Sequence, residues 1–450
     1  MKTSKYELDM TQGSIFKNVL RFAIPYMLTS MLQIFYNSAD LVVVSRWTGS
    51  SAMASVGATS ALTTLLINLF LGMSVGSSVI VSRHYGAHNI ERLKSAVHTS
   101  VLFGVIVGII SSLLGLLLCK PLLICMDTPD GSVLDGAVLY MRIIFLGTPA
   151  TLIYSFSSAI LRSVGDTKRP LYILSISGLA NIGLNLVFVI KFGMGVAGVA
   201  LATIISKYIS AVWVLVILIF ANGDYKVCIK DLRINPRELK DILHIGVPAG
   251  LQNTVLSISN TLIQSAVNSF GVAAMAGSSA AHNIESFVFG IKDAFRQATV
   301  TAISQNYGAQ NKKRMDKSFR VCISSMLVVG IFITLIITLF AKPLLSIYIT
   351  DSAEAMKYGV MRMMVTGIPY FLSGIMDMYI GYLRGLGHSG RSTVNSFIGI
   401  CGFRILWVLV VFPQYRNFAF LYLCWPLSWI LTTVLNAITL HSVKKDLKFE

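Results

Sequence analysis

The stretch SRHYGAHNIER at residues 82–92 returns as SQNYGAQNKKR at residues 304–314, 222 positions later. The same offset places KPL at residues 120–122 onto KPL at 342–344, and LRSVG at 161–165 onto LRGLG at 383–387. Within two residues of this offset, Pro25 matches Pro248, and MRIIFLGTP at 141–149 matches MRMMVTGIP at 361–369. An internal duplication explains all of these matches, so we expect two halves of similar structure.

The regions around these motifs are strongly apolar. Hydrophobic residues make up 54% of the chain and charged residues 13%, against about 25% charged in a typical soluble domain. Apolar stretches of about 20 residues, enough for a helix to cross a hydrocarbon core, recur along the whole length. They are long and continuous rather than short and alternating, which favours helices over a barrel. We predict an all-α polytopic membrane protein with twelve transmembrane helices.

The predicted spans are residues 16–44, 52–81, 95–118, 138–161, 170–191, 195–221, 240–268, 274–302, 319–341, 359–383, 393–413 and 418–441. They divide into an N-terminal lobe at 1–221, a linker at 222–239 and a C-terminal lobe at 240–450. Because each lobe has an even number of helices, the repeat is parallel, with its pseudo-symmetry axis along the membrane normal. Paired lobes flanking a cavity are typical of alternating-access carriers.

The net charge of +17 raises the question of nucleic-acid binding, which the distribution of cations answers. With the N-terminus in the cytoplasm, the inner loops and tails hold 25 Lys and Arg residues and the outer side eight. This asymmetry predicts a cell inner or plasma membrane protein with both termini cytoplasmic, in contact with anionic lipid and not with nucleic acid. Glu7 and Asp9 precede a long apolar span, so we expect no cleavable signal peptide.

Enzyme signatures are absent from the sequence. The six cysteines have no paired metal-ligand spacing, and no cluster of His, Asp, Glu or Cys suggests a nucleophile and base. A phosphate-binding loop is also lacking, so no motif couples the chain to ATP. We therefore expect a transporter driven by ion gradients, with no enzymatic activity, no cofactor and no structural metal.

Asp40 is the clearest charge within a predicted span. An aspartate at mid-helix costs about 2.5 to 3.5 kcal/mol on insertion scales, so it is expected to face a partner or water. Gln33, Tyr36, Asn37 and Asp40 share one helix face. Pro25 removes a helical hydrogen bond and is expected to bend the helix below this face. The alternative is that Asp40 is a buried hydrogen-bonding group between helices.

Neutral oxygens in the fifth and sixth spans suit a cation site with Asp40. Asn181 and Asn185 lie one turn apart, and Thr203 follows in the next span. The position matching Asp40 in the second half is Ile263, where the seventh span instead carries the uncharged stripe Asn253, Ser257, Asn260 and Gln264. The carboxylate is therefore not duplicated.

The second half has its own charges within the predicted spans. The eighth span carries His282 and Glu285, followed by Lys292, Asp293 and Arg296. Asp377 and Arg404 lie in the tenth and eleventh spans, where they form an ion pair with each other or line the cavity. As a candidate substrate cavity or second cation site we name Asn253, Ser257, Asn260, His282, Glu285, Asp377 and Arg404.

Together, the Pro25 to Asp40 segment, the YGA motifs at Tyr85 and Tyr307, and the LRSVGDTKRP and LRGLGHSGRS segments resemble the prokaryotic multidrug and toxic compound extrusion (MATE) transporters. The resemblance spans nearly the whole chain. It implies twelve helices in two lobes and cation-coupled antiport, with Asp40 as the proton or sodium site and Gln33 and Tyr36 as its neighbours. Asn181 and Thr203 match the family pattern, whereas Asn185 stands in place of an acid. Asp377 lies one turn beyond the family's position near Ser373.

The resemblance implies an efflux transporter that exchanges H+ or Na+ for cationic or amphipathic drugs or toxic compounds. We expect the protein to be a monomer. Loss of the second carboxylate at Asn185 favours H+ as the coupling ion, with Na+ as the alternative. A flippase for lipid-linked sugars or cell-wall precursors is the nearest rival. Its cavity would need cations to hold pyrophosphate, and Lys207 and Arg404 are the few candidates.

Overall fold

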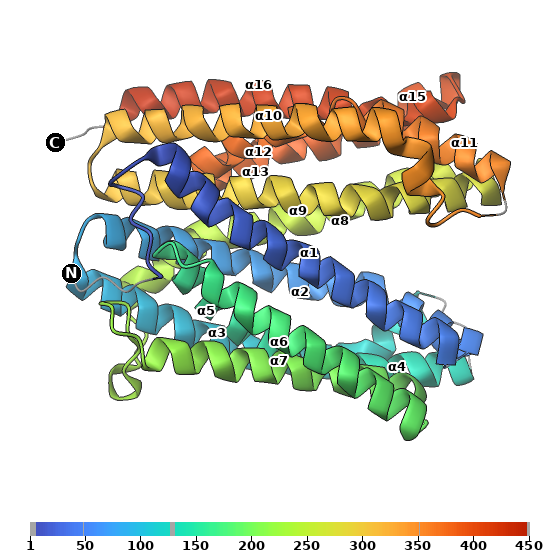
Figure 1. Cartoon of the computed structure of the whole chain (residues 1–450), viewed down its shortest axis with the longest axis horizontal. Helices are drawn as coiled ribbons and strands as arrows, with labels where there is room; N and C mark the ends of the chain where they lie inside the picture. The colour runs from blue at the N-terminus through green and yellow to red at the C-terminus, as the bar shows by residue number, and fades with distance from the viewer. Residues whose placement is uncertain (1–5, 48, 127–130, 351, 448–450) are drawn as a thin grey trace. The chain divides into compact units, whose positions relative to one another are not determined.

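The computed structural model of the chain describes residues 6–47, 49–126, 131–350 and 352–447. Helices account for the regular structure of these residues, and no strand occurs among them (Figure 1). Each predicted span coincides with one helix or with one run of consecutive helical segments. The all-α prediction is therefore confirmed.

The described residues of the first half form seven α-helices. They are α1 (Ile15–Trp47), α2 (Gly49–Gly86), α3 (Ile90–Cys125), α4 (Ser132–Leu146), α5 (Thr148–Ser163), α6 (Lys168–Asn185) with a π-helical continuation η1 (Leu186–Lys191), and α7 (Gly195–Ile219). A short 3-10 helix, η2 (Ile229–Asp231), lies in the connection to the second half.

The second half repeats this order with more interruptions. It comprises α8 (Pro236–Asn268), α9 (Val272–Gly308), α10 (Lys312–Leu345), α11 (Ala353–Arg362), η3 (Met363–Gly367), α12 (Tyr370–Gly385), α13 (Ser389–Ser396), η4 (Phe397–Gly402), α14 (Phe403–Leu406), η5 (Trp407–Val411), η6 (Phe412–Gln414), α15 (Phe418–Tyr422) and α16 (Cys424–Asp446).

Many of these helices are suited to a bilayer. Among the described residues, seven helical segments are long and apolar enough to cross a membrane, and two bent pairs bring the number to nine. The remaining long helices, α2, α8 and α9, have 38, 33 and 37 residues, well above the roughly 20 that a span needs. α8 and α9 carry the polar stripe and the charges noted in the sequence.

The bent pairs interrupt two spans that the sequence predicts as continuous. α4 and α5 meet at Gly147 with a bend of 40°, and α11–η3 meets α12 with a bend of 45°. Pro149 and Pro369 lie at these breaks, where a proline cannot donate a helical hydrogen bond. These two prolines are the matched ends of the MRIIFLGTP and MRMMVTGIP motifs.

The internal duplication is visible in backbone detail. Two described non-glycine residues have a positive φ, His88 at 51° and Gln310 at 55°, and they are 222 positions apart. The residue after each, Asn89 or Asn311, caps the next helix by accepting a hydrogen bond from the amide three residues on. The YGA motif is therefore a turn between two long helices, repeated in both halves.

Contacts divide the chain into two compact units. Unit 1 comprises residues 1–9 and 28–250, and unit 2 comprises 10–27 and 251–450. Two boundaries between the units fall within helices: α1 passes from unit 2 to unit 1 after Met27, and α8 passes from unit 1 to unit 2 after Gly250. Each boundary lies two residues after a proline. Each unit is discontinuous in sequence, whereas the predicted lobes 1–221 and 240–450 are continuous. The two lobes therefore stay a prediction.

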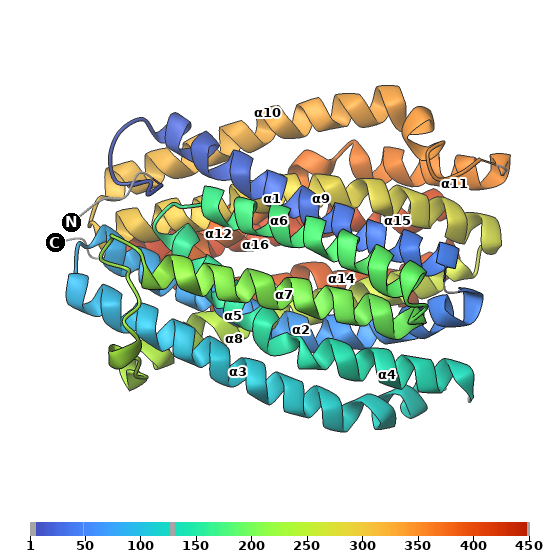
Figure 2. The ribbon, with the colours of Figure 1, turned by 60° about the horizontal axis from the view of Figure 1, so that its bottom comes forward.

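Small residues permit close helix packing within each unit. In unit 1, a Cβ on Gly108 of α3 would lie 2.7 Å from Pro149 Cα of α5. In unit 2, a Cβ on Gly330 of α10 would lie 2.7 Å from Phe371 Cβ of α12. These contacts are equivalent under the 222-residue offset, and helices in membranes commonly associate through such small residues. Figure 2 shows α3 and α7 of unit 1 from a second direction.

Candidate functional site

Asp40 is the acid around which the predicted cation site is built. It lies in the second part of α1, half-buried, and faces α6 and α7 within unit 1. The side-chain amide of Asn185 donates to Asp40 Oδ1 over 2.5 Å, and the Thr203 hydroxyl lies 3.4 Å from Oδ2. The structure therefore brings together Asp40, Asn185 and Thr203 as predicted.

Asn181 completes this cluster, which we call the Asp40 cluster: Asp40, Asn181, Asn185 and Thr203. The amide of Asn185 also reaches Asn181 Oδ1 at 3.4 Å, so one side chain bridges the carboxylate and the second asparagine. Both asparagines are buried and lie four residues apart on one face of α6. Asn185 is the last residue before the π-helical segment η1, a kind of irregularity frequent at functional sites.

Two acceptor oxygens of the cluster lack a strong donor. The Thr203 hydroxyl has a single proton and lies only 2.9 Å from the Val199 carbonyl, so its contact with Asp40 Oδ2 is the weaker one. Asn185 Oδ1 is buried without any hydrogen-bond partner. A buried acceptor left unsatisfied costs about 1 to 3 kcal/mol, so these oxygens form a place that favours a proton or a cation.

Lys207 and Tyr140 are neighbours of Asp40 that the sequence did not assign. Each interacts electrostatically with the Asp40 carboxylate. Lys207 lies one turn after Thr203 on α7, so the i, i+4 spacing was the signal that could have placed it at the cluster. Its ammonium group adds a positive charge beside the only carboxylate of the cluster.

The other predicted neighbours on α1 have a different position. The Tyr36 hydroxyl donates to the Ser175 carbonyl of α6 over 3.1 Å, and its ring packs on Gly178. Gln33 is exposed, and no contact between its side chain and Asp40 is observed. Tyr36 therefore holds α1 against α6, whereas neither residue touches the carboxylate.

Glu285 belongs to a buried network in unit 2. Its carboxylate pairs with Arg362 at 2.6 Å and accepts a hydrogen bond from Thr366 at 2.6 Å. Arg362 also donates to the Ser278 hydroxyl at 2.6 Å and to Tyr422 at 3.1 Å. The partner of Glu285 is thus Arg362, which is one of the eight cations that the sequence assigns to the outer side of the membrane.

Asp377 is paired as well. Lys292 lies 3.1 Å from Asp377 Oδ2 and donates to the Ser373 hydroxyl over 2.7 Å. The possible Asp377–Arg404 ion pair is therefore wrong, because α9 supplies the cation instead. Ser373 is the position near which the resemblance placed the family's acid, and here it shares Lys292 with Asp377. Asp293 is paired with Arg296 and accepts a hydrogen bond from Tyr26 at 2.9 Å.

Arg404 is a buried cation held by neutral groups. It donates to Ser428 over 3.0 Å and to Asn260 over 3.3 Å, and its guanidinium lies 4.1 Å from the centre of the Trp425 ring. No described carboxylate forms an ion pair with it. The stripe on α8 is thereby connected to Arg404 through Asn260, while Ser257 bonds its own helix at Asn253.

One group in unit 1 has ligand spacing for a metal ion. His98, Cys228 and Asp231 bring their ligand atoms within 4.8 Å of one another. Both ring nitrogens of His98 are already engaged, however. Nδ1 lies 2.7 Å from the Lys94 carbonyl, and Nε2 accepts the backbone amide of Cys228 at 3.0 Å. The residues therefore do not fit a metal site.

The family model MatE matches residues 25–187 and again residues 248–410, that is, once in each half. The chain belongs to the MATE family of transporters. The two matches begin 223 residues apart, at Pro25 and Pro248, which agrees with the internal duplication.

Individual relatives cover nearly the same extent. The chain is 28% identical over 415 residues to a probable multidrug resistance protein of Bacillus subtilis, YoeA, covering 90% of this chain and 89% of that protein. It is 26% identical over 390 residues to the probable multidrug resistance protein NorM of Thermotoga maritima, covering 85% and 83%.

A solved structure supports the fold assignment of this MATE protein. An outward-facing MATE family transporter has a TM-score of 0.90 to the chain at 22% identity, covering 99% of this chain and all of that one. The MATE fold has twelve helices in two lobes, so the predicted fold class is confirmed. The chain is a multi-pass membrane protein.

Proposed function

We propose that this MATE protein is an efflux antiporter that exchanges protons for cationic or amphipathic drugs by alternating access. The observation that carries the proposal is the Asp40 cluster, where a single carboxylate lies within the membrane-spanning helices beside buried acceptors. The names of the relatives, as multidrug resistance proteins, support drug-like substrates. Drug export is the activity common to these findings.

The geometry of Asn185 favours a proton over sodium. The side-chain N–H of Asn185, not its oxygen, points at Asp40 Oδ1. This N–H group occupies a position that a bound cation would need. Sodium prefers several oxygen ligands, as hard cations do, whereas a proton needs only the free oxygen of the carboxylate. Sodium remains the alternative if the Asn185 amide turns over.

The coupling energy limits what one proton can drive. A charge crossing about 100 mV gains roughly 2.3 kcal/mol, and a tenfold proton gradient adds about 1.4 kcal/mol. Exchange of a proton for a neutral drug is driven by both the membrane potential and the proton gradient. Exchange with a monovalent cation moves no net charge, leaving about tenfold accumulation per pH unit. The pairing of Glu285 with Arg362 and Asp377 with Lys292 makes both less suited to bind a second cation.

We place both termini in the cytoplasm and the chain, as a monomer, in the cell membrane, in line with the excess of cations in the inner loops. In the transport cycle, Asp40 takes up a proton from outside and drug leaves outward. The inward-facing state then releases the proton and reloads drug. Pro25 permits a bend in α1, the helix that carries Asp40. Protonation of Asp40 is thereby coupled to the bending of α1.

A flippase for lipid-linked sugar precursors is the second candidate. Such a carrier would need several free cations to hold a pyrophosphate. In unit 2, Lys292, Arg296 and Arg362 each pair with an acid, which leaves two buried cations, Arg384 and Arg404, bonded to neutral groups. This balance of charge supports drug efflux over pyrophosphate binding.

The test is efflux of the cationic dye ethidium from proteoliposomes under a pH gradient or a sodium gradient, imposed separately. Wild type is expected to move dye under the pH gradient, and Asp40→Asn is expected to lose at least nine-tenths of that rate. Asp135→Asn, at an exposed aspartate in the first turn of α4, is the matched control and should keep the wild-type rate. Movement driven by sodium alone would overturn proton coupling, and no movement under either gradient would favour the flippase.

A further inference from the structure

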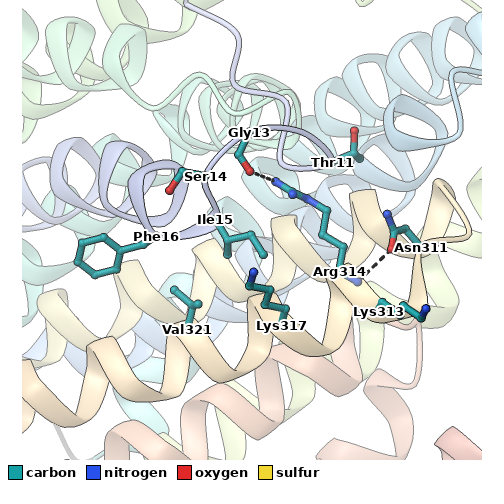
Figure 3. A pocket seen from close by; sticks show the side chains of 10 residues that line it. All are labelled: Thr11, Gly13, Ser14, Ile15, Phe16, Asn311, Lys313, Arg314, Lys317 and Val321. Carbon is teal, nitrogen blue, oxygen red and sulfur yellow. Dashed lines mark hydrogen bonds between the residues drawn. The ribbon is translucent and has the colours of Figure 1, made fainter.

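A basic pocket lies at the start of α10, outside the Asp40 cluster and the charged network of unit 2. It has a volume of about 490 Å³ and lies entirely within unit 2, in the size range of small-molecule sites. Its walls are the segment before α1, the first turn of α1 and the first turns of α10 (Figure 3). The ten lining residues include three cations, Lys313, Arg314 and Lys317, and no acid.

Arg314 builds the wall of this pocket. Its guanidinium group extends from α10 and donates to the backbone carbonyls of Met10, Gln12 and Gly13 at 2.9, 2.5 and 2.9 Å. These bonds fix the segment before α1 against α10, and Gly13 allows the turn with a φ of 68°. The pocket is therefore a formed feature of the fold.

Lys313 and Lys317 supply the charge for a ligand. They lie four residues apart on one face of α10, both exposed, and neither forms an ion pair with a described acid. Asp316, between them in sequence, is bonded to Lys444 at 2.5 Å and to Tyr382 at 2.9 Å. α1 and α10 both begin at the pocket, and helix N-termini favour anions. The ligand is therefore expected to be an anion.

The apolar side of the pocket indicates what carries this anion. Val321 follows Lys317 by one turn on the same face of α10, and Ile15 and Phe16 of α1 also line the pocket. Phe16 is 56% exposed. Since α10 is a candidate membrane span, this face changes from cationic to apolar as the helix enters the membrane. A soluble anion would leave the apolar part uncovered, whereas an amphiphile would fill both parts.

We propose that this pocket binds the headgroup phosphodiester of an anionic phospholipid, with its acyl chain along Phe16 and Val321. Basic pockets between membrane helices on the cytoplasmic side are suited to such headgroups. The assignment to the cytoplasmic leaflet rests on the proposed orientation of the chain, but binding itself depends on neither that orientation nor transport. The lipid connects the start of α1, which carries Asp40 farther along, to α10.

The experiment measures binding to the full-length protein purified in detergent and stripped of lipid. Dioleoyl phosphatidylglycerol, dioleoyl phosphatidylcholine or inorganic phosphate is titrated, and bound lipid is counted by native mass spectrometry alongside the change in Tm. Lys313→Gln with Lys317→Gln tests the pocket. Lys230→Gln with Lys240→Gln, at exposed residues of η2 and of the N-terminal part of α8, removes the same charge elsewhere and is the matched control.

Phosphatidylglycerol is expected to raise the Tm of wild type and of the control, with phosphatidylcholine and inorganic phosphate having little effect. The pocket variant should bind phosphatidylglycerol about 30-fold more weakly, from roughly fivefold per lysine. Phe16→Gln should weaken binding of the dioleoyl lipid more than that of its short-chain dihexanoyl form. Equal binding by the pocket variant and the control, or saturation of the site by inorganic phosphate, would overturn the proposal. Because no transport is measured, these outcomes are independent of the efflux assay.

Discussion

The side-chain amide of Asn185 donates a hydrogen bond to Asp40 Oδ1 over 2.5 Å, joining α6 to α1 at the cation cluster. Because residue 185 carries an amide, Asp40 is the only acid of the cluster. With an acid at 185 instead, two carboxylates would lie in contact and could not both be charged without a cation between them. The residue at 185 is therefore expected to determine which ion the cluster binds.

Asn185→Asp tests this expectation. The variant is expected to gain transport that responds to sodium, because two carboxylates and the Asn181 and Thr203 oxygens form an oxygen-rich site that suits a hard cation. Ethidium efflux from proteoliposomes, measured with and without a sodium gradient at constant pH, is the readout. Asn185→Leu is the control, expected to gain no sodium response. If Asn185→Asp keeps the ion dependence of wild type, residue 185 does not set ion choice.

The Glu285–Arg362 pair predicts a strong effect on stability. Glu285→Gln leaves the Arg362 charge buried without its acid, and removal of one partner from a buried pair costs about 3 to 5 kcal/mol. The double variant Glu285→Gln, Arg362→Gln is expected to be more stable than Glu285→Gln alone, because no uncompensated charge remains. Thermal unfolding of the purified variants in detergent gives the comparison.

The same variants separate structure from cation coupling. If Glu285 serves only the ion pair, the double variant should restore efflux together with stability. If Glu285 binds a coupling cation, efflux should stay low in the double variant even where its Tm returns. The second result would contradict the structural role that the 2.6 Å contact with Arg362 suggests.

Asp166 predicts a pH dependence of stability. It lies between α5 and α6, fully buried, and burial raises its pKa to about 6 although Arg169 pairs with it at 3.4 Å. The folded state thus binds more protons than the unfolded state between pH about 4 and 6. The free energy of unfolding is expected to fall as pH rises through this window, by up to about 3 kcal/mol.

Asp166→Asn removes this titration and can still accept the Arg169 amide that the aspartate accepts at 3.1 Å. Relative to wild type, the variant should therefore become more stable as pH rises from 4.5 to 7.5. Thermal unfolding at several pH values gives the difference in Tm, with Asp135→Asn as an exposed control. A difference that does not change with pH would show that Asp166 keeps an ordinary pKa.

Pro25 and Pro248 allow a matched test of helix bending. Both lie inside helices, α1 and α8, and in each helix the contact boundary between the compact units follows two residues later. Pro25→Ala restores a hydrogen-bond donor and should stiffen α1 below Asp40. We expect slower efflux with an unchanged or higher Tm, and a smaller effect from Pro248→Ala, since α8 carries no matching acid. Efflux at the wild-type rate in Pro25→Ala would rule out bending at this position.

Much of the fold could be predicted from the sequence because membrane helices are determined by local apolar length. The spans and the duplication required no knowledge of tertiary contacts, and the 222-residue offset reappears in His88 and Gln310. The breaks at Gly147 and before Tyr370 could not be located in this way, because their residues are as apolar as those of a continuous span. Only the prolines beside them signal the bends.

The site could be predicted only in part, and for a definite reason. The grouping of Asp40, Asn185 and Thr203 could be predicted from the helix faces and from the family resemblance, because Asn185 and Thr203 both face Asp40. The partners of Glu285 and Asp377 depend on how α9, α11 and α12 are rotated about their axes, which spacing along one helix does not reveal. The burial of Arg362 beside Glu285 could not be predicted for the same reason.

The packing of Tyr36 on Gly178 gives the last prediction. A Cβ at Gly178 would lie 1.9 Å from Tyr36 Cε2, so Gly178→Ala must displace the ring and with it the contact between α1 and α6. Overpacking of this kind costs about 1 to 3 kcal/mol, and displacement of α1 would also lengthen the Asn185–Asp40 hydrogen bond. We therefore expect a lower Tm and slower proton-driven efflux.

The same helix provides the control for Gly178→Ala. Gly183 is exposed on α6 and a Cβ there meets nothing within 4 Å, so Gly183→Ala should leave efflux unchanged and stabilise the helix by up to about 1 kcal/mol. In the Gly178→Ala background, Tyr36→Ala removes the clashing ring and should recover part of the lost Tm. Equal Tm values for Gly178→Ala and Gly183→Ala would mean that α1 and α6 can separate at this contact without loss, and that Tyr36 does not position the Asp40 cluster.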